Sequence, residues 1–221
     1  MRDLVKQEEF ELEVLDRLNS GKFLSSLIFT GGTMLRLCFG LNRFSVDLDF
    51  WMTEAVDTKK FYRTLVEYLG EFYELTDSAD KFYTLLLELR SSRYPRRLKL
   101  EIRKEPRKLK TESAIAYSKY TNRQVLLNIV SLQEMMKAKT EAFLDRKEVR
   151  DVFDMEFLLK KGVELDVGKE KLKALLSGMG ALTKNDYDVK LAAVLDSEQR
   201  KYYSVENFKV LKAAIKDRLD T

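Results

Sequence analysis

Two aspartates separated by a single residue, Asp47 and Asp49, stand in a stretch where polar and apolar residues alternate. On a β-strand such residues point to the same face, with Cα atoms about 6.5–7 Å apart. Carboxylates at that spacing repel each other unless a cation lies between them or they face open water. Mg²⁺ prefers oxygen ligands and is usually held by one or two carboxylates together with substrate phosphates. The pair therefore indicates either a metal site or a solvated strand edge.

A glycine pair with a following threonine, Gly31, Gly32 and Thr33, lies between the apolar run 27–30 and a short helix-forming segment. Thr33 is a suitable N-cap for that helix, which we expect to end near Gly40. Glycines at such a junction allow a phosphate to approach backbone N–H groups at the start of the helix. An ordinary helix entry has the same pattern, so both interpretations stay open.

A third acid, Glu101, occurs in the alternating segment 98–102. The leucines and isoleucine of this segment share one face of a strand, so Lys99 and Glu101 share the other. Glu101 would join Asp47 and Asp49 if the two strands are neighbours. The alternative is a polar sheet face without a ligand.

The order Gly-Gly-Thr, Asp-x-Asp and a later strand carboxylate is typical of nucleotidyltransferases. In two-metal sites, ions about 3.5–4 Å apart stabilise the attacking and the leaving oxygen. One ion would activate an acceptor hydroxyl and the other would hold the triphosphate. The protein then mainly positions groups and neutralises charge, which requires no histidine.

Longer segments resemble the AbiEii/AbiGii-type nucleotidyltransferase toxins of bacterial and archaeal toxin–antitoxin systems. The matching residues are 31–37, 42–50, 99–102, 132–146 and 150–155, within roughly residues 27–160. The last sixty or so residues carry no motif that we can match. The resemblance implies an α+β fold: a nucleotidyltransferase-like mixed β-sheet core with flanking helices, followed by a helical C-terminal domain that completes the nucleotide site.

The resemblance also implies roles for particular residues. Asp47 and Asp49 would bind the catalytic metals, two Mg²⁺ ions with Mn²⁺ as a possible substitute, and Glu101 would complete the site. The family often has Asp at this third position, and the Glu side chain present here is longer, so its carboxylate extends farther from the strand. Lys139 matches the lysine that would contact the nucleotide phosphates, and Asp154 matches the aspartate of the second domain.

Two positions near this second group allow another interpretation. Asp151 begins the same Arg-Asp-x-x-Asp turn, and we interpret it as a structural partner of Arg150 or as a helix end. The roles of Asp151 and Asp154 could be interchanged. Without the family, Lys139 would be interpreted as part of a solvated helix face.

Further residues are candidates for contacts with the nucleotide. Arg36 lies one turn into the short helix and could hold a phosphate bidentately, or pair with an acid. Ser45 precedes Asp47 by two residues and would face the same side of the strand, where it could contact a metal-bound phosphate or cap the strand locally. The predicted nucleotide-binding set is Gly31, Gly32, Thr33, Arg36, Ser45 and Lys139.

A basic stretch follows the first half of the predicted sheet. Lys and Arg neutralise phosphates, and a tyrosine within such a stretch can stack on a base. This is typical of an RNA track, although a solvated hairpin explains the same residues. The stretch comprises Arg90, Arg93, Tyr94, Arg96, Arg97, Lys99, Arg103, Lys104, Arg107, Lys108 and Lys110.

These observations favour an Mg²⁺-dependent nucleotidyltransferase that moves NMP from an NTP to an acceptor, with RNA such as tRNA as the expected acceptor. In the family context the protein would be a toxin with a cognate antitoxin as partner. Two alternatives remain open: a nucleotide- or RNA-binding module without turnover, and a nucleotidyltransferase that modifies a protein. The sequence identifies neither the base, the acceptor, the type of antitoxin nor the oligomeric state.

Composition excludes several classes of protein. The 221 residues contain no histidine and one cysteine, Cys38, which removes His-dependent catalysis, His-ligated zinc and a disulfide framework. The 40 Lys and Arg against 36 Asp and Glu give a net charge of +4, too small to prove a nucleic-acid partner. We find no signal peptide and no apolar run that could span a membrane, so we expect a cytoplasmic protein.

Periodicity predicts the elements that position these residues. Helical spacing covers 4–18, 58–69 (capped by Asp57), 132–144, 148–160, 169–176 and 188 to the C-terminus, whereas strand alternation covers 45–52, 82–89 and 98–102. Strands are thus confined to the first part of the chain. We expect a catalytic α/β domain at residues 1–125 and a helical domain at 126–221, with a poorly defined boundary.

Overall fold

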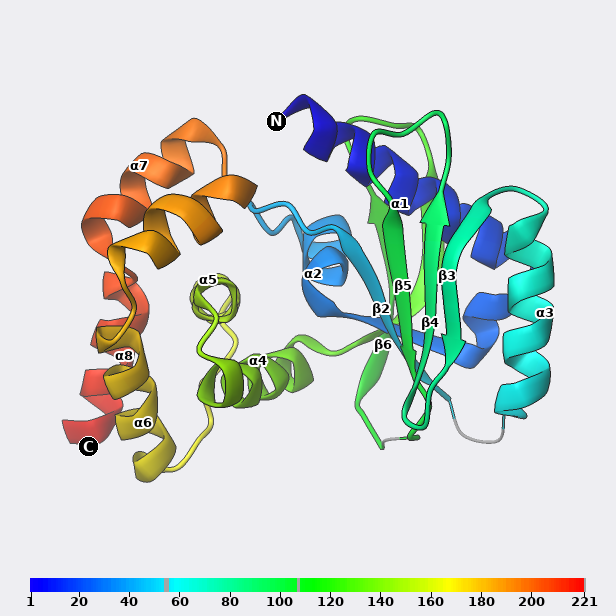
Figure 1. Ribbon diagram of the computed structural model, residues 1–221. Helices are drawn as coiled ribbons and strands as arrows, with labels where there is room; N and C mark the ends of the chain where they lie inside the picture. Colours follow the sequence, from blue (N-terminus) through cyan, green and yellow to red (C-terminus); the bar gives the residue numbers. More distant parts are fainter. Residues whose placement is uncertain (54–55, 107, 221) are drawn as a thin grey trace. The chain divides into compact units, whose positions relative to one another are not determined.

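The computed structural model describes residues 1–53, 56–106 and 108–220. The chain is α+β and forms two compact units, Met1–Ser131 and Leu132–Thr221 (Figure 1). The first unit contains a β-sheet with flanking helices, and the regular elements of the described part of the second unit are helices. The predicted division after residue 125 falls within the last strand of the sheet, whereas the first unit ends just after that strand. Arg107 of the predicted basic stretch lies outside the described residues.

In the described part of the first unit, seven strands form one mixed sheet in the order β3-β4-β5-β2-β1-β7-β6. The pairs β2–β5 and β1–β7 are parallel, and the remaining neighbours are antiparallel. The strands are β1 (Leu27–Thr30), β2 (Asp47–Met52), β3 (Glu74–Asp80), β4 (Thr84–Arg90), β5 (Leu98–Arg103), β6 (Thr111–Tyr117) and β7 (Gln124–Val130).

Strict alternation gives the central strands one apolar face and one polar face. On β2 the side chains of Leu48, Phe50 and Met52 are buried, and on β5 those of Leu98, Leu100 and Ile102 are buried. Helices α1 (Arg2–Ser20) and α3 (Thr58–Gly70) pack on the sheet. A hydrogen bond connects the two helices, because Tyr68 Oη on α3 donates to the Arg17 carbonyl on α1 at 3.0 Å. The acids of β2 and β5 consequently lie on the opposite, half-buried face.

Two connections complete the first unit. The short 3₁₀ helix η1 (Phe23–Ser26) leads into β1, and α2 (Gly31–Phe39) connects β1 to β2. Gly40 ends α2 with φ 76°, as its sequence position predicts. Burial raises the pKa of the Cys38 thiol in α2 to about 12, which makes it a poor nucleophile at neutral pH.

Several predicted boundaries agree with the structure and others are wrong. Asp57 caps α3 by accepting a hydrogen bond from the Lys60 backbone N–H at 3.1 Å, as predicted. The predicted strand 45–52 begins only at Asp47, so Ser45 precedes the strand. Strands β3, β6 and β7 were not predicted. Most residues of the edge strands β3 and β6 are exposed or half-buried, so their sequences lack the apolar alternation of β2 and β5.

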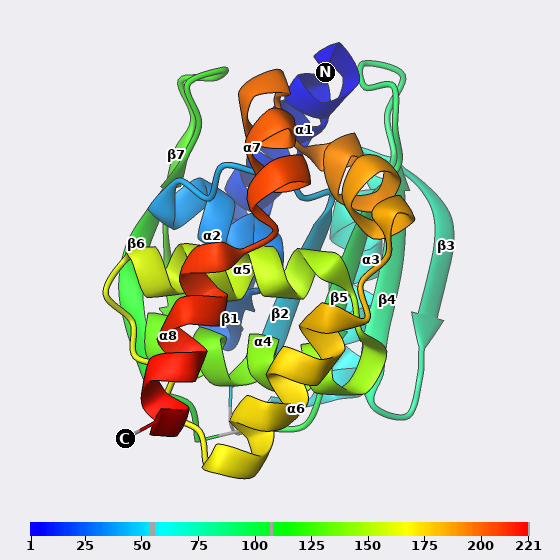
Figure 2. The same cartoon turned by 90° about the vertical axis from the view of Figure 1, so that its left-hand side faces the viewer.

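The second unit begins with three helices near the predicted positions, α4 (Leu132–Arg146), α5 (Val149–Lys160) and α6 (Lys169–Gly180) (Figure 2). The helical spacing predicted from residue 188 to the C-terminus corresponds to several helical elements. That part of the chain forms the π-helical turn η2 (Asp186–Leu191), the 3₁₀ turn η3 (Ala192–Val194), α7 (Ser197–Glu206) and α8 (Lys209–Asp220). Asn207 and Phe208 have positive φ angles of 46° and 58°, which interrupt the helix.

A buried carboxylate, Glu156 on α5, joins the C-terminal helices of this unit. It accepts hydrogen bonds from Tyr203 Oη at 3.0 Å and from the Leu211 backbone N–H at 3.1 Å, and it pairs with Lys160. α7 and α8 are thereby fixed to α5. Among the described helices of the whole chain, none combines the length and the apolar character that crossing a membrane requires.

Candidate active site

The junction between β1 and α2 brings the glycine pair against polar side chains of the next strand. Gly31 has φ +81°, and a Cβ atom there would overlap with Asp49 Oδ2. A Cβ atom at Gly32 would lie 2.9 Å from Ser45 Oγ. A side chain would therefore collide with the Asp49 carboxylate at Gly31, and with the Arg43 guanidinium and the Ser45 hydroxyl at Gly32, which explains why the local sequence is Gly-Gly.

The two aspartates lie on β2 with their side chains half-buried, on the face opposite Leu48 and Phe50. Thr30, the last residue of β1, pairs with Asp49 in the antiparallel register. The predicted N-cap role of Thr33 is wrong, because α2 begins at Gly31. The buried Thr33 instead donates its hydroxyl hydrogen to the Asp47 backbone carbonyl at 2.6 Å. This bond fixes the first turn of α2 to the start of β2.

Glu101 reaches the same region because β5 is the parallel neighbour of β2. The register places Asp49 opposite Glu101 and Asp47 opposite Lys99, so the two strands are neighbours, as the placement of Glu101 beside the aspartates requires. Lys99 Nζ forms an ion pair with Glu101 Oε2 at 2.7 Å. This hydrogen bond raises the pKa of Lys99, and the charges of Asp47 and Asp49 raise it further. Lys99 thus lies among the three acids rather than in an RNA track. The alternation of the segment 98–102 already placed Lys99 on the same strand face as Glu101.

The arrangement of these acids bears on whether a metal would fit. Among residues 1–53, 56–106 and 108–220, no three Asp, Glu or Cys side chains gather closely enough to hold an ion. Two carboxylates on one face of β2, with Asp49 against the glycine that begins α2, still match the oxygen ligands that Mg²⁺ takes besides substrate phosphates. The donor chemistry therefore fits a divalent cation at Asp47 and Asp49. Glu101 lies on the neighbouring strand and pairs with Lys99.

Arg36, a predicted phosphate ligand, makes its contacts with the protein. Its Nε donates to Glu8 on α1, its Nη1 donates to the Leu41 carbonyl at 3.1 Å, and its guanidinium lies 3.8 Å from the centre of the Phe44 ring. The paired acid is therefore on a different helix. These contacts fix α2 to α1.

The second group of predicted residues comes together within the second unit, at the crossing of α4 and α5. Lys139 is buried, and its Nζ lies 2.7 Å from Asp154 Oδ2 and 3.3 Å from Asp151 Oδ1. Both aspartates are fully buried. Asp151 lies in the first turn of α5, and its partner is Arg146 at 2.7 and 2.8 Å rather than Arg150. Lys139 is therefore no solvated surface lysine.

Helix α1 contributes buried acids that the sequence did not predict as functional. Glu8 pairs with Arg36 and accepts a hydrogen bond from Ser118 Oγ, whereas Glu11 is fully buried and neither carboxyl oxygen has a hydrogen-bond partner among the described residues. Burial, followed by the charge of Glu8 and then that of Asp47, raises the pKa of Glu11 well above its usual range. No signal in the helical pattern distinguishes such acids from solvated ones.

Most of the described members of the basic stretch have partners within the first unit. Arg103 lies 5.1 Å from the centre of the Trp51 ring, so it too has a contact on the sheet. The ion pairs are Arg93–Glu13, Arg97–Glu88, Lys99–Glu101 and Lys104–Asp80. The continuous basic track predicted from the sequence is thereby reduced to shorter segments.

Comparisons with known proteins bear on the fold and on the family. Two solved structures from Helicobacter pylori, JHP933 and a nucleotidyltransferase candidate, are 23% and 22% identical to this chain, each with a TM-score of 0.57. The alignments cover 95% and 96% of this chain and 94% and 96% of theirs. The family described as nucleotidyl transferase AbiEii toxin of type IV toxin–antitoxin systems matches residues 13–212. The chain belongs to the AbiEii family. No curated protein matches it in sequence.

The AbiEii match extends beyond the resemblance at residues 27–160 in both directions. It begins within α1 and ends within α8, so it includes the helices for which the sequence offered no motif. It also includes every predicted site residue of both units. The AbiEii family is one of nucleotidyltransferases, and a transferase activity follows from membership.

Proposed function

We propose that this AbiEii protein is a metal-dependent nucleotidyltransferase that transfers NMP from an NTP to an RNA acceptor such as tRNA. In this role it acts as a toxin that a cognate antitoxin opposes. One observation carries the proposal: Asp47 and Asp49 share the polar face of β2, and the absence of a side chain at Gly31 lets the Asp49 carboxylate lie against the start of α2.

The residues around the two aspartates suit the binding of a triphosphate and a cation. Asp47 and Asp49 would hold Mg²⁺, and Glu101 is the candidate for a third ligand. Bound ions would neutralise phosphate charge and make an acceptor hydroxyl easier to deprotonate. Gly31 and Gly32 offer backbone N–H groups at the start of α2, where the helix dipole favours an anion.

Two lysines add positive charge to this proposal. Lys99 is held by Glu101 near Asp47 and Asp49, where its ammonium group can bind an oxygen of the triphosphate. Lys139 in the second unit is the proposed ligand of the nucleotide phosphates, with Asp154 orienting its ammonium group. Both lysines therefore act by positioning and neutralising the substrate, which is the main task of a protein in phosphoryl transfer.

Label transfer tests the proposal. Purified protein is mixed with Mg²⁺, total tRNA and each of the four α-labelled NTPs in turn, and the products are separated by size. We expect label on RNA, loss of the signal with EDTA, and a decrease of at least about 100-fold in Asp49→Asn. Asp77→Asn is the matched control, because Asp77 is an exposed aspartate of the edge strand β3.

The remaining outcomes contradict particular parts of the proposal. Label on a protein instead of RNA would support the nucleotidyl transfer and contradict RNA as the acceptor. NTP binding without label on any acceptor, with Mg²⁺ or Mn²⁺, would overturn the transfer itself and favour a binding module. Equal activity in Asp49→Asn and Asp77→Asn would remove Asp49 from the site.

A further inference from the structure

The turn between β4 and β5, residues 91–97, encloses a cavity of about 300 Å³ at its base. Its lining is rich in donors and contains no carboxylate: Arg90, Arg96 and Arg97 contribute with Ser91 and Ser92. Guanidinium and hydroxyl groups are the side chains that bind phosphate oxygens most effectively. The chemistry of the lining is therefore that of an anion site.

Two of these arginines have unused hydrogen-bonding capacity. Arg90 and Arg96 are exposed, and neither guanidinium group makes a hydrogen bond or an ion pair with any residue in the part of the chain that the structure describes. Arg97 Nη1 forms an ion pair with Glu88 Oε1 at 2.7 Å, and both side chains are partly exposed. The cavity consequently offers two guanidinium groups that no acid in residues 1–53, 56–106 and 108–220 neutralises.

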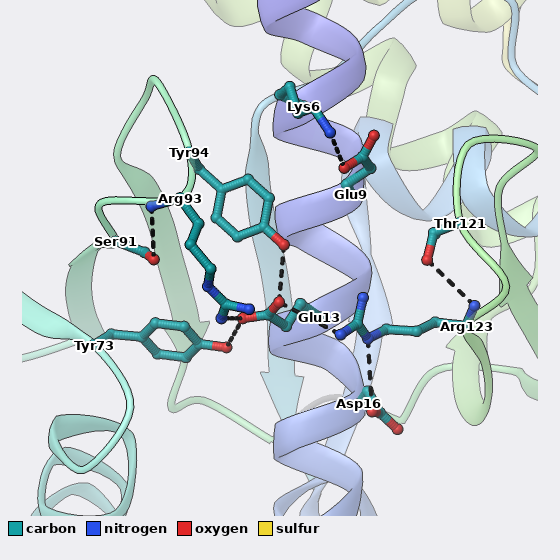
Figure 3. Close-up of polar contacts among 10 residues, drawn as sticks. All are labelled: Lys6, Glu9, Glu13, Asp16, Tyr73, Ser91, Arg93, Tyr94, Thr121 and Arg123. Atoms are coloured by element: carbon teal, nitrogen blue, oxygen red, sulfur yellow. Dashed lines mark hydrogen bonds and ion pairs between the residues drawn. The ribbon is translucent and has the colours of Figure 1, made fainter.

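The turn is anchored to α1 from its inner side (Figure 3). Tyr94 stacks on Phe10 with ring centres 4.5 Å apart, and Tyr94 Oη donates to Glu13 at 2.8 Å. Arg93 also pairs with Glu13. Tyr94 is thus engaged in the protein and is no platform for a base, so the predicted stacking role is replaced by an anchoring one. An anchored turn loses little conformational freedom when a ligand binds.

The turn also lies next to the start of β2. Gln7 Nε2 on α1 donates to both the Val46 carbonyl and the Arg97 carbonyl, each at 3.3 Å. Val46 immediately precedes Asp47, and Arg97 precedes β5, whose register pairs Lys99 with Asp47. The arginine-lined cavity is therefore adjacent to the strand ends that carry the candidate active site.

We infer that this cavity binds backbone phosphates of the RNA that receives the nucleotide, and that Arg90 and Arg96 are the phosphate ligands. The inference rests on the proposed function for the acceptor role of the RNA. A repeating polyanion fits two unneutralised arginines at an open turn. A membrane surface is less suitable, because interfacial binding also needs exposed apolar side chains and the cavity offers only Tyr94 and Pro95.

Equilibrium binding tests the inference without any catalytic step. The dissociation constant of a fluorescently labelled 20-nucleotide RNA, and of labelled total tRNA, is measured for the full chain without NTP or divalent metal at several KCl concentrations. Arg90→Ala/Arg96→Ala should weaken binding at least about 10-fold and reduce the salt slope by about 1.4 for the single strand, since each phosphate contact contributes about 0.7. Arg90→Lys/Arg96→Lys should keep the slope and weaken binding less.

The matched control is Lys59→Ala/Arg63→Ala, which removes two exposed basic residues one turn apart on α3. We expect the control to bind RNA within about 2-fold of the unmodified protein. An equal loss in the control, or an unchanged salt slope in Arg90→Ala/Arg96→Ala, would overturn the inference. All these side chains are exposed, so the variants should fold normally.

Two further measurements distinguish other ligands. A weakened affinity for NTP with unchanged RNA binding would assign the cavity to the nucleotide instead. Loss of binding to phosphatidylserine vesicles with unchanged RNA binding would assign it to a membrane, and either result refutes the inference. A chain that binds RNA through this turn but transfers no label contradicts the proposed function alone. Unchanged RNA binding and label transfer in Arg90→Ala/Arg96→Ala contradict the cavity assignment alone.

Discussion

Two glutamates on opposite sides of α1, Glu11 and Glu13, are equally buried and differ completely in their surroundings. Residues two apart on a helix are separated by about 200°, so the two carboxyl groups point in different directions. Glu13 accepts hydrogen bonds from Tyr73, Tyr94, Arg93 and Arg123 (Figure 3). Glu11 has no hydrogen-bond partner in the described part of the chain, and the charges that act on it include those of Glu8 and Asp47.

The comparison teaches that the supply of donors, rather than burial, decides what a buried carboxyl group does. Four donors stabilise the carboxylate of Glu13. Because Arg93 and Tyr94 come from the β4–β5 turn and Arg123 from the segment after β6, these hydrogen bonds connect both segments to α1. Burial and the hydrogen bond to Glu13 raise the pKa of Tyr94 to about 12, so this donor keeps its proton. Without donors, Glu11 retains its own proton to a higher pH than in the unfolded chain.

A third case, in the second unit, places a buried ammonium group between two buried aspartates and predicts the largest effect. There Lys139 pairs with both Asp151 and Asp154, and Asp151 also accepts two hydrogen bonds from Arg146. Lys139→Met removes that group and leaves Asp154 buried at the α4–α5 crossing, which should lower the free energy of unfolding by about 3–5 kcal/mol. Urea unfolding followed by far-ultraviolet circular dichroism measures the change.

Lys137→Met is the control for this prediction, two residues away on the same helix. Lys137 is exposed and pairs with Glu134 at 3.1 Å, a surface contact worth about 0.5 kcal/mol or less. If both variants lost the same small amount, the buried lysine would not be needed to neutralise the aspartates.

The second largest effect is expected when the charge of Glu13 is removed. Glu13→Gln retains the shape but replaces one acceptor oxygen by a donor that faces arginine and tyrosine donors, which should cost about 2–3 kcal/mol. Trp51, the one tryptophan of the chain, lies on β2 and reports on unfolding of this unit by fluorescence.

Glu9→Gln is the matched control, because Glu9 lies on the same helix and forms a surface pair with Lys6 at 2.6 Å (Figure 3). We expect a change of about 0.5 kcal/mol or less there. Similar small losses in both variants would show that the four donors of Glu13 find equivalent partners elsewhere.

The part of the fold that the sequence predicted is the part in which alternation and burial agree. The segments around Asp47 and Glu101 alternate in burial, and the parallel register of β2 and β5 meets the condition under which their acids become neighbours. The edge strands β3 and β6 are mostly exposed and lack alternation, so hydrogen bonding to neighbours rather than side-chain pattern defines them.

The sequence patterns could not predict which charged side chains are buried. Glu8, Glu11 and Glu13 occupy a helix whose periodicity describes only its apolar side, and the partners of Glu8 and Glu13 come from segments up to 110 residues away. Lys139 illustrates the same limit, since its helix spacing alone indicates a solvated face and its partners lie on α5. Tertiary contacts decide such residues, and only the family resemblance pointed to Lys139.

The smallest effect, and the one that sharpens the comparison most, concerns Glu11. Because its pKa is raised in the folded state, the folded protein binds more protons than the unfolded chain, and stability falls as pH rises above the unfolded pKa of about 4.3. Glu11→Gln removes this pH-dependent contribution to the free energy of unfolding. The variant should be close in stability to the unmodified protein at pH 4, where both side chains are neutral and of similar shape, and become the more stable protein as pH increases toward 8. Glu13→Gln should remain the less stable protein at pH 8, because Glu13 accepts hydrogen bonds from four donors. Parallel stability curves for Glu11→Gln and the unmodified protein between pH 4 and 8 would mean that Glu11 ionises in the fold as it does in water, and the contrast between the two sides of α1 would then fail.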